Sequence, residues 1–101
     1  MNICFIDNNK ISYDQNSLND KSIRGAERAV INLALNLNKL GHKVTVLNHI
    51  RKKSVYENIR FVNIEYYNDD IVFDLAISNN DINNFNFIKA SKKIAISHSI
   101  Q

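Results

Sequence analysis

A chain of 101 residues with a net charge of +3 has room for one domain and one modest hydrophobic core. Apolar residues make up 45% of it, proline is absent and only two glycines occur, which argues against a fibrous, linker-rich or turn-rich all-β chain. The lone Cys4 excludes an internal disulfide framework and a cysteine metal site. There is no signal-peptide pattern at the start and no apolar run near the ~20 residues of a membrane-spanning helix, so the sequence predicts a cytoplasmic protein.

The basic residues gather in two clusters, one at 51–53 and one at 89–93. Such clusters can attract phosphates or anionic lipid, so weak peripheral association with the inner face of the membrane stays open. Solvated loop charge is the commoner explanation. Neither cluster contains interleaved aromatic residues, and we therefore expect no nucleic-acid partner.

The first predicted element is a strand from Ile3 to Ile6, a continuous apolar run that ends at Asp7. A run of this kind is typical of a strand buried on both faces of a parallel sheet. Residues 8–24 then form a long and mostly polar connection. Connections of this length are either disordered or functional.

The clearest predicted helix covers Gly25–Leu40, and its apolar residues recur at intervals of three and four. The main stripe consists of Ala26, Ala29, Val30, Leu33, Ala34, Leu37 and Leu40. Glu27 and Arg28 are expected on the other, solvated side. Ile31 and Leu35 fall outside the stripe, so either the helix is covered on two sides or this second ridge awaits a partner surface.

Gly41 follows this helix directly and is a good left-handed stop residue. Further strands are predicted at 43–47, 59–64, 74–78 and 93–97, with a short helix between the last two that Asp81 is placed to cap. The alternation predicts an α/β fold with a Rossmann-like, mostly parallel open sheet and flanking helices. No helix follows the last predicted strand, so we expect residues 1–101 to form a single and incomplete domain.

Polar residues follow the carboxyl ends of the predicted strands, which is where open α/β sheets bind ligands. Asn8 and Asn79 are therefore candidate substrate-binding residues, and His98, after the last strand, is a candidate catalytic residue. Gly25 would let a phosphate approach the backbone amides at the start of the main helix, and Arg24 beside it adds positive charge. This predicts a phosphate-binding position at Arg24 and Gly25.

Each of these residues also has a simpler interpretation. Gly25 could be an ordinary N-cap, Arg24 a solvated helix charge and His98 a surface residue. Asp7 could indicate a phosphorylated receiver domain, but Asn79 stands where that fold needs a second aspartate.

Several established motifs are absent from the sequence. It contains no dinucleotide-binding glycine motif, no Walker A motif, no nucleophile elbow and no metal-ligand spacing. His42 and His49 fall in predicted turns and are given no role. We therefore expect neither a metal nor a cofactor.

The segment RGAERAVINLA at 24–34, continuing through LGHKVTV at 40–46, resembles the amino-terminal domain of glycosyltransferase family 4. Members commonly show a Gly-Gly-Ala-Glu-Arg phrase, an amphipathic helix and then a Leu-Gly-His segment leading into a strand. The stretches Phe73–Ser78 and Lys93–His98 are similar to two later strands of the family. The resemblance covers nearly the whole chain, and its specific part is the first block.

The resemblance implies a GT-B fold and retaining transfer of a hexosyl group from a nucleotide-sugar to a glycan or lipid acceptor. In the family the amino-terminal domain mainly holds the acceptor, and a carboxy-terminal Rossmann-like domain, missing from this chain, makes most donor contacts. By position, Gly25 matches the second glycine of the loop near the donor phosphates, and Arg24 replaces the first. His98 matches a histidine that faces the reaction centre.

Half of such a cleft cannot close around a donor, so we expect no turnover by the 101-residue chain alone. The alternative is a stand-alone, non-catalytic α/β module that binds a partner through the sheet edge and the Ile31/Leu35 ridge.

Overall fold

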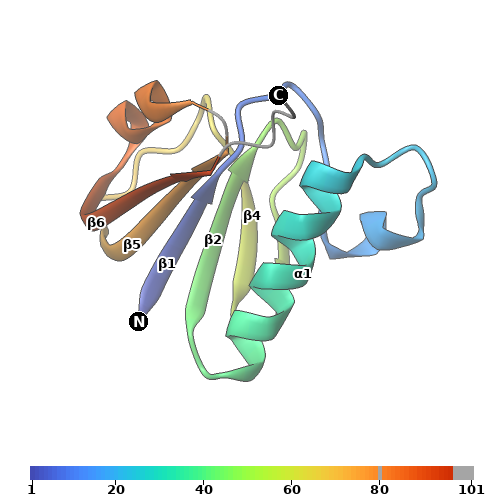
Figure 1. Cartoon of the computed structure of the whole chain (residues 1–101), viewed down its shortest axis with the longest axis horizontal. Helices are drawn as coiled ribbons and strands as arrows, with labels where there is room; N and C mark the ends of the chain where they lie inside the picture. Colours follow the sequence, from blue (N-terminus) through green and yellow to red (C-terminus); the bar gives the residue numbers. More distant parts are fainter. Residues whose placement is uncertain (80, 97–101) are drawn as a thin grey trace.

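The computed structural model describes residues 1–79 and 81–96. Its six strands form one mixed, mostly parallel open sheet in the order β3–β4–β2–β1–β5–β6 (Figure 1). The strands are β1 (Asn2–Ile6), β2 (Lys43–Asn48), β3 (Ser54–Tyr56), β4 (Ile59–Asn63), β5 (Val72–Asn79) and β6 (Lys89–Ile96). The chain therefore has the predicted α/β fold with flanking helices.

The sheet is covered by a different kind of structure on each face. Helix α1 (Gly25–Lys39) packs on one face, where Val30 and Ile31 meet Phe5 of β1 in the larger hydrophobic core. On the other face, Phe85 of the short 3₁₀ helix η2 (Ile82–Phe87) packs against a smaller core that contains Cys4. Figure 1 shows α1 over the β2 and β4 side of the sheet, and among the described residues no helix lies over β5 and β6 on that face.

Helix α1 buries only part of the predicted stripe: Val30 and Ala34 lie in the core, but other members do not. Ile31 is 0% exposed and belongs to the core, and Leu35 packs against the same core. Leu33 is 45% exposed and Leu40 is 73% exposed, although both belong to the predicted stripe. The proposed Ile31/Leu35 docking ridge is therefore wrong, because these side chains are the contact between α1 and its own sheet.

Strands β3 and β6 depart furthest from the prediction. The three-residue strand β3 was not predicted; it pairs antiparallel with β4 through a turn in which Glu57 has a positive φ of 53°. Strand β6 begins at Lys89, four residues before its predicted start. Its register against β5, with Ile77 beside Ile94, extends the parallel sheet to an edge that carries several exposed lysines.

The predicted end of α1 is confirmed. Gly41 has φ +92°, and its amide donates a hydrogen bond to the Asn38 carbonyl at 3.0 Å. Because this conformation strains any residue with a Cβ, the glycine is required here.

The long connection between β1 and α1 is an ordered loop held by Arg28. It contains one turn of 3₁₀ helix, η1 (Gln15–Asn19), whose start is capped by the Asp14 side chain. The Arg28 guanidinium donates hydrogen bonds to the carbonyl oxygens of Leu18 (2.9 Å), Asp20 (2.6 Å) and Ile23 (3.1 Å). Arg28 was expected to be solvated, and instead it fixes the loop to the helix. In the described part of the chain, no helix has the length and apolar character needed to cross a membrane.

Candidate functional site

The candidate site lies at the carboxyl ends of β1 and β5, which are adjacent and parallel. The connection after β1 leads to α1 on one face of the sheet, whereas the connection after β5 leads to η2 on the other. The chain therefore departs in opposite directions from two neighbouring strands. Ligands of open α/β sheets bind in the crevice that this arrangement creates.

Asp7 lies at the end of β1 with only 1% of its surface exposed. Its amide continues the β1 ladder by donating to the Leu47 carbonyl at 2.8 Å. Carboxylate oxygen Oδ2 accepts a hydrogen bond from the hydroxyl of Tyr13 at 2.8 Å, and Tyr13 is itself 2% exposed. The other oxygen, Oδ1, is buried and has no hydrogen-bond partner among the described residues.

The environment of Asp7 favours its protonated form. Burial raises the pKa of the Asp7 carboxyl above its ordinary value, and the charge of nearby Glu27 acts in the same direction. The Tyr13 hydroxyl opposes this by bonding to the charged form. The Asn79 amide is near enough to oppose it as well, although Asp7 Oδ1 and Asn79 Nδ2 do not meet hydrogen-bond geometry.

Glu27, on the first turn of α1, is fully buried. Its Oε1 and Oε2 atoms accept hydrogen bonds from Nε (3.0 Å) and Nη2 (3.4 Å) of Arg24. The Arg24 side chain is 60% exposed, so the anion of this ion pair is buried and the cation is at the surface. The expectation that Glu27 would face solvent is wrong: its negative charge lies beside the positive end of the helix dipole and opposite Arg24.

Gly25 is the first helical residue of α1, and Arg24 occupies the N-cap position. The N-cap interpretation of Gly25 is therefore wrong. Among the described residues, no side-chain hydrogen bond caps the first amides of the helix. Nor does any described atom beyond the adjoining helix backbone lie within 4 Å of the place where a Cβ on Gly25 would stand, so packing does not require a glycine here.

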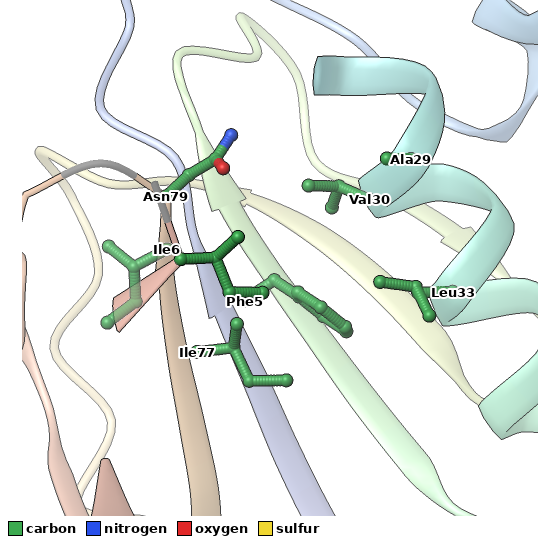
Figure 2. Close-up of a pocket in the computed structure, with 8 residues that line it drawn as sticks. Phe5, Ile6, Ala29, Val30, Leu33, Ile77 and Asn79 are labelled. Atoms are coloured by element: carbon green, nitrogen blue, oxygen red, sulfur yellow. The ribbon is translucent and has the colours of Figure 1, made fainter. Parts of the chain in front are cut away.

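Asn79 ends β5 directly beside Asp7, because the β1–β5 register pairs Ile6 with Ser78. Asn79 is 5% exposed, and its Nδ2 has no hydrogen-bond partner among the described residues. Figure 2 shows its amide projecting from the end of β5 towards the space between β1 and α1. A cavity of about 20 Å³ adjoins it, lined otherwise by apolar side chains such as Phe5, Val30 and Leu33.

The other candidates lie at the rim of this crevice or beyond the described residues. Asn8 is exposed, and its Oδ1 lies 2.5 Å from Nε2 of His49, a residue that was given no role in the sequence analysis. Nδ1 of His49 lies 3.8 Å from a carboxylate oxygen of Glu65. His98 lies outside the described residues, so its catalytic role stays a prediction.

Asn48, at the end of β2, holds the neighbouring loops in place through side-chain hydrogen bonds. Its side chain donates to the Tyr13 carbonyl at 2.9 Å and accepts from the Ile50 amide at 2.7 Å. These bonds hold the loop that carries Tyr13, and through it they orient Asp7. Within residues 1–79 and 81–96, no group of three or more His, Cys, Asp or Glu side chains is placed to hold a metal ion.

The predicted roles of Asn79, Arg24 and Gly25 stay predictions, and the sequence analysis missed the buried Tyr13 and Glu27. The signal for Glu27 was a carboxylate three residues after the N-cap, a position that often faces the helix end. No protein-family model, curated protein or solved structure matches the chain.

Proposed function

We propose that this chain is the amino-terminal, acceptor-side part of a nucleotide-sugar-dependent glycosyltransferase of the GT-B class, with a Rossmann-like sheet. The observation that carries the proposal is the pair of buried polar residues Asp7 and Asn79 at the adjacent carboxyl ends of β1 and β5. The start of α1 lies near them, since the charges of Arg24 and Glu27 act on the Asp7 carboxyl. The resemblance of residues 24–46 to glycosyltransferase family 4 falls on the same place.

The start of α1 suits the donor diphosphate. Its first amides are uncapped, the helix dipole favours an anion there, and Gly25 leaves room for close approach. Charge develops on the leaving diphosphate in the transition state of sugar transfer, so donors aimed at it lower the barrier. Arg24 would add a positive charge at this position while its Nε and Nη2 hold Glu27.

A second Rossmann-like domain would complete the cleft. It would supply most donor contacts and exclude water, and so we expect no turnover by this chain alone. His98 is proposed to face the reaction centre and Asn8 to contact substrate at the rim. We place the protein in the cytoplasm, where the exposed lysines of β6 would support weak association with anionic lipid.

The proposal is tested by titrating the isotope-labelled chain with UDP-glucose and GDP-mannose while recording backbone amide signals. We expect saturable shifts centred on Gly25, Ala26 and Glu27 with a dissociation constant in the millimolar range, because half a cleft binds weakly. Shifts confined to other surfaces, or none with either nucleotide-sugar, would overturn the proposal.

A stand-alone binding module is the second candidate. One observation favours it, namely two exposed apolar side chains on the α1 side of the sheet. Ile94 of β6 is 48% exposed there, and Leu33 of α1 is 45% exposed. A stable complex that protects Ile94 and Leu33 from solvent, without any nucleotide-sugar binding, would favour this function over the first.

A further inference from the structure

Strand β6 forms an open edge of the sheet. It is the last strand in the order β3–β4–β2–β1–β5–β6, and it pairs with β5 from its first residue to its last (Figure 1). Every second residue of an edge strand directs its backbone N–H and C=O groups away from the sheet, where a further strand can bind them. Among the described residues, no segment other than β5 pairs with β6.

The side chains of β6 are accessible on both faces of the sheet. Residues 91–95 are all exposed, and Ile94 has 48% of its surface exposed. The opposite edge, β3, is only three residues long and turns directly into β4 through Glu57, which has a positive φ. The long edge that this sheet offers to an extended segment is therefore β6.

The charge of β6 is entirely positive. Lys89, Lys92 and Lys93 are exposed, and no aspartate or glutamate occurs from residue 82 to residue 96. An approaching segment therefore meets three cations along eight residues of open edge. This favours carboxylates over cationic side chains beside β6.

The register of β6 against β5 places these cations on particular faces. Lys92 pairs with Leu75, which packs on the α1 side of the sheet. Lys93 lies on the η2 side, where its Nζ is 6.0 Å from the centre of the Phe85 ring. Ile94 returns to the α1 side, since side chains alternate along a strand. The edge thus presents one cation on each face, followed by an exposed apolar side chain.

The same lysines disfavour a second copy of the chain at this edge. An antiparallel pairing of two β6 strands over their full length would place Lys92 of each copy opposite Lys93 of the other. Like charges directly opposite each other destabilise a sheet, and lysine on an edge strand is a common protection against self-association. A segment that carries carboxylates meets no such repulsion, and its charges stabilise the pairing instead.

We propose that β6 binds an extended acidic segment of a partner protein, which adds a strand to the sheet at this edge. Backbone hydrogen bonds hold the segment, and two adjacent carboxylates, one on each face, lie beside Lys92 and Lys93. A β-branched residue next to them covers Ile94. The expected motif is therefore two adjacent acidic residues flanked by valine or isoleucine. This binding needs no nucleotide-sugar and goes beyond the proposed glycosyl transfer.

The probe for this site is the capped peptide Thr-Val-Glu-Glu-Val-Thr, whose pattern is the same in the parallel and the antiparallel direction. Titrated into the isotope-labelled chain, it should give saturable amide shifts centred on residues 91–95. The affinity should fall as NaCl rises from about 50 to about 500 mM, because salt screens exposed charges. The matched peptide Thr-Val-Lys-Lys-Val-Thr should bind at least tenfold more weakly.

A charge-reversed variant tests the selectivity. Lys92→Glu/Lys93→Glu should reverse the preference, so that the lysine peptide binds more tightly than the glutamate peptide. Lys52→Glu/Lys53→Glu makes the same change at the other basic cluster, also at exposed positions, and should keep the wild-type preference. Should the reversed variant fail to fold, Lys92→Glu alone should lower the preference for the glutamate peptide.

The absence of a saturable shift with the glutamate peptide, or equal affinity for the two peptides, would overturn the inference. Shifts centred outside residues 89–96 would do the same. Binding to vesicles of phosphatidylserine and phosphatidylcholine without any peptide binding would assign the lysines to a membrane, and the partner segment would be wrong. The proposed function is tested separately, because nucleotide-sugars are read at the Gly25 amide and the peptide at residues 91–95.

Discussion

Glu27 has no exposed side-chain surface, whereas its ion-pair partner Arg24, whose Nε lies 3.0 Å from Glu27 Oε1, has 60% of its side chain exposed. The anion of the pair is therefore in the interior and the cation is at the surface. Removing the cation leaves the buried Glu27 charge without a partner. Neutralising the anion removes the free-energy cost of burying that charge.

We expect Arg24→Gln to lower the free energy of unfolding more than Glu27→Gln does. The double variant should be more stable than Arg24→Gln, because the buried carboxylate is then absent. Urea unfolding of the three variants at pH 7 measures this order. Greater damage from Glu27→Gln than from Arg24→Gln would show that the carboxylate has further partners that matter more than Arg24.

The second prediction concerns Asp7 and pH. Since the folded-state pKa of Asp7 is raised, the folded protein binds this proton more tightly than the unfolded chain does. Its contribution to stability is full below the unfolded pKa of about 3.9 and is lost as pH rises through the folded-state pKa. Asp7→Asn should therefore stabilise the protein by about 1 kcal/mol at pH 7, and by less as the pH falls towards 4. A gain that stays constant between pH 4 and pH 7 would contradict the raised pKa.

The third prediction concerns the loop that Arg28 holds. Arg28→Ala removes three hydrogen bonds to the carbonyls of residues 18, 20 and 23, and we expect a loss of about 2 kcal/mol. Limited proteolysis should also cut residues 15–23 faster than in the wild type. Arg51→Ala, at an exposed position, is the matched control and should change neither. Equal cutting of both variants would mean that Arg28 does not hold the loop.

The fourth prediction compares two residues of α1. Ile31→Ala should cost about 3 kcal/mol, because Ile31 is 0% exposed in the core. Leu33→Ala should cost less than about 1 kcal/mol, because Leu33 is 45% exposed. Thermal or urea unfolding measures both. A larger loss of stability from Leu33→Ala than from Ile31→Ala would mean that α1 packs on the sheet through the face that carries Leu33.

The sequence predicted the α/β class and the positions of its main strands along the chain because their apolar runs are continuous and short. It predicted the end of α1 because a glycine directly after a helix has one common conformational use, and Gly41 adopts it. The short strand β3 could not be predicted, since its three residues, Ser-Val-Tyr, form a strand only by pairing with β4.

The buried face of α1 was predicted only in part. Val30 and Ala34 lie in the core as expected, but the core also includes Ile31, whereas Leu33 is 45% exposed. Periodicity alone could not tell which leucines and alanines of the stripe would meet the sheet.

Tyr13 was missed because its surroundings come from residues far away in the chain, such as Asn48 and Phe61. Glu27 was missed although its partner Arg24 is only three residues away. Asp7 meets Tyr13 only after the loop folds back over β1.

Gly25 allows the most direct test of the proposed phosphate position at the start of α1. Gly25→Ala should not disturb the fold, because no described atom beyond the adjoining helix backbone lies within 4 Å of the new methyl group, and it should add about 0.5 kcal/mol to the stability of the helix. Gly41→Ala, which places a methyl group at φ +92°, should instead destabilise the protein by about 1 kcal/mol. These opposite effects show whether the backbone at each position is as described.

The decisive measurement is the affinity of Gly25→Ala for UDP-glucose and GDP-mannose, compared with that of the wild type by the same amide titration. We expect the variant to bind at least tenfold more weakly although it is at least as stable, because the methyl group occupies the space that the donor phosphates need. Unchanged affinity in the variant would contradict the assignment of the α1 start as the phosphate position.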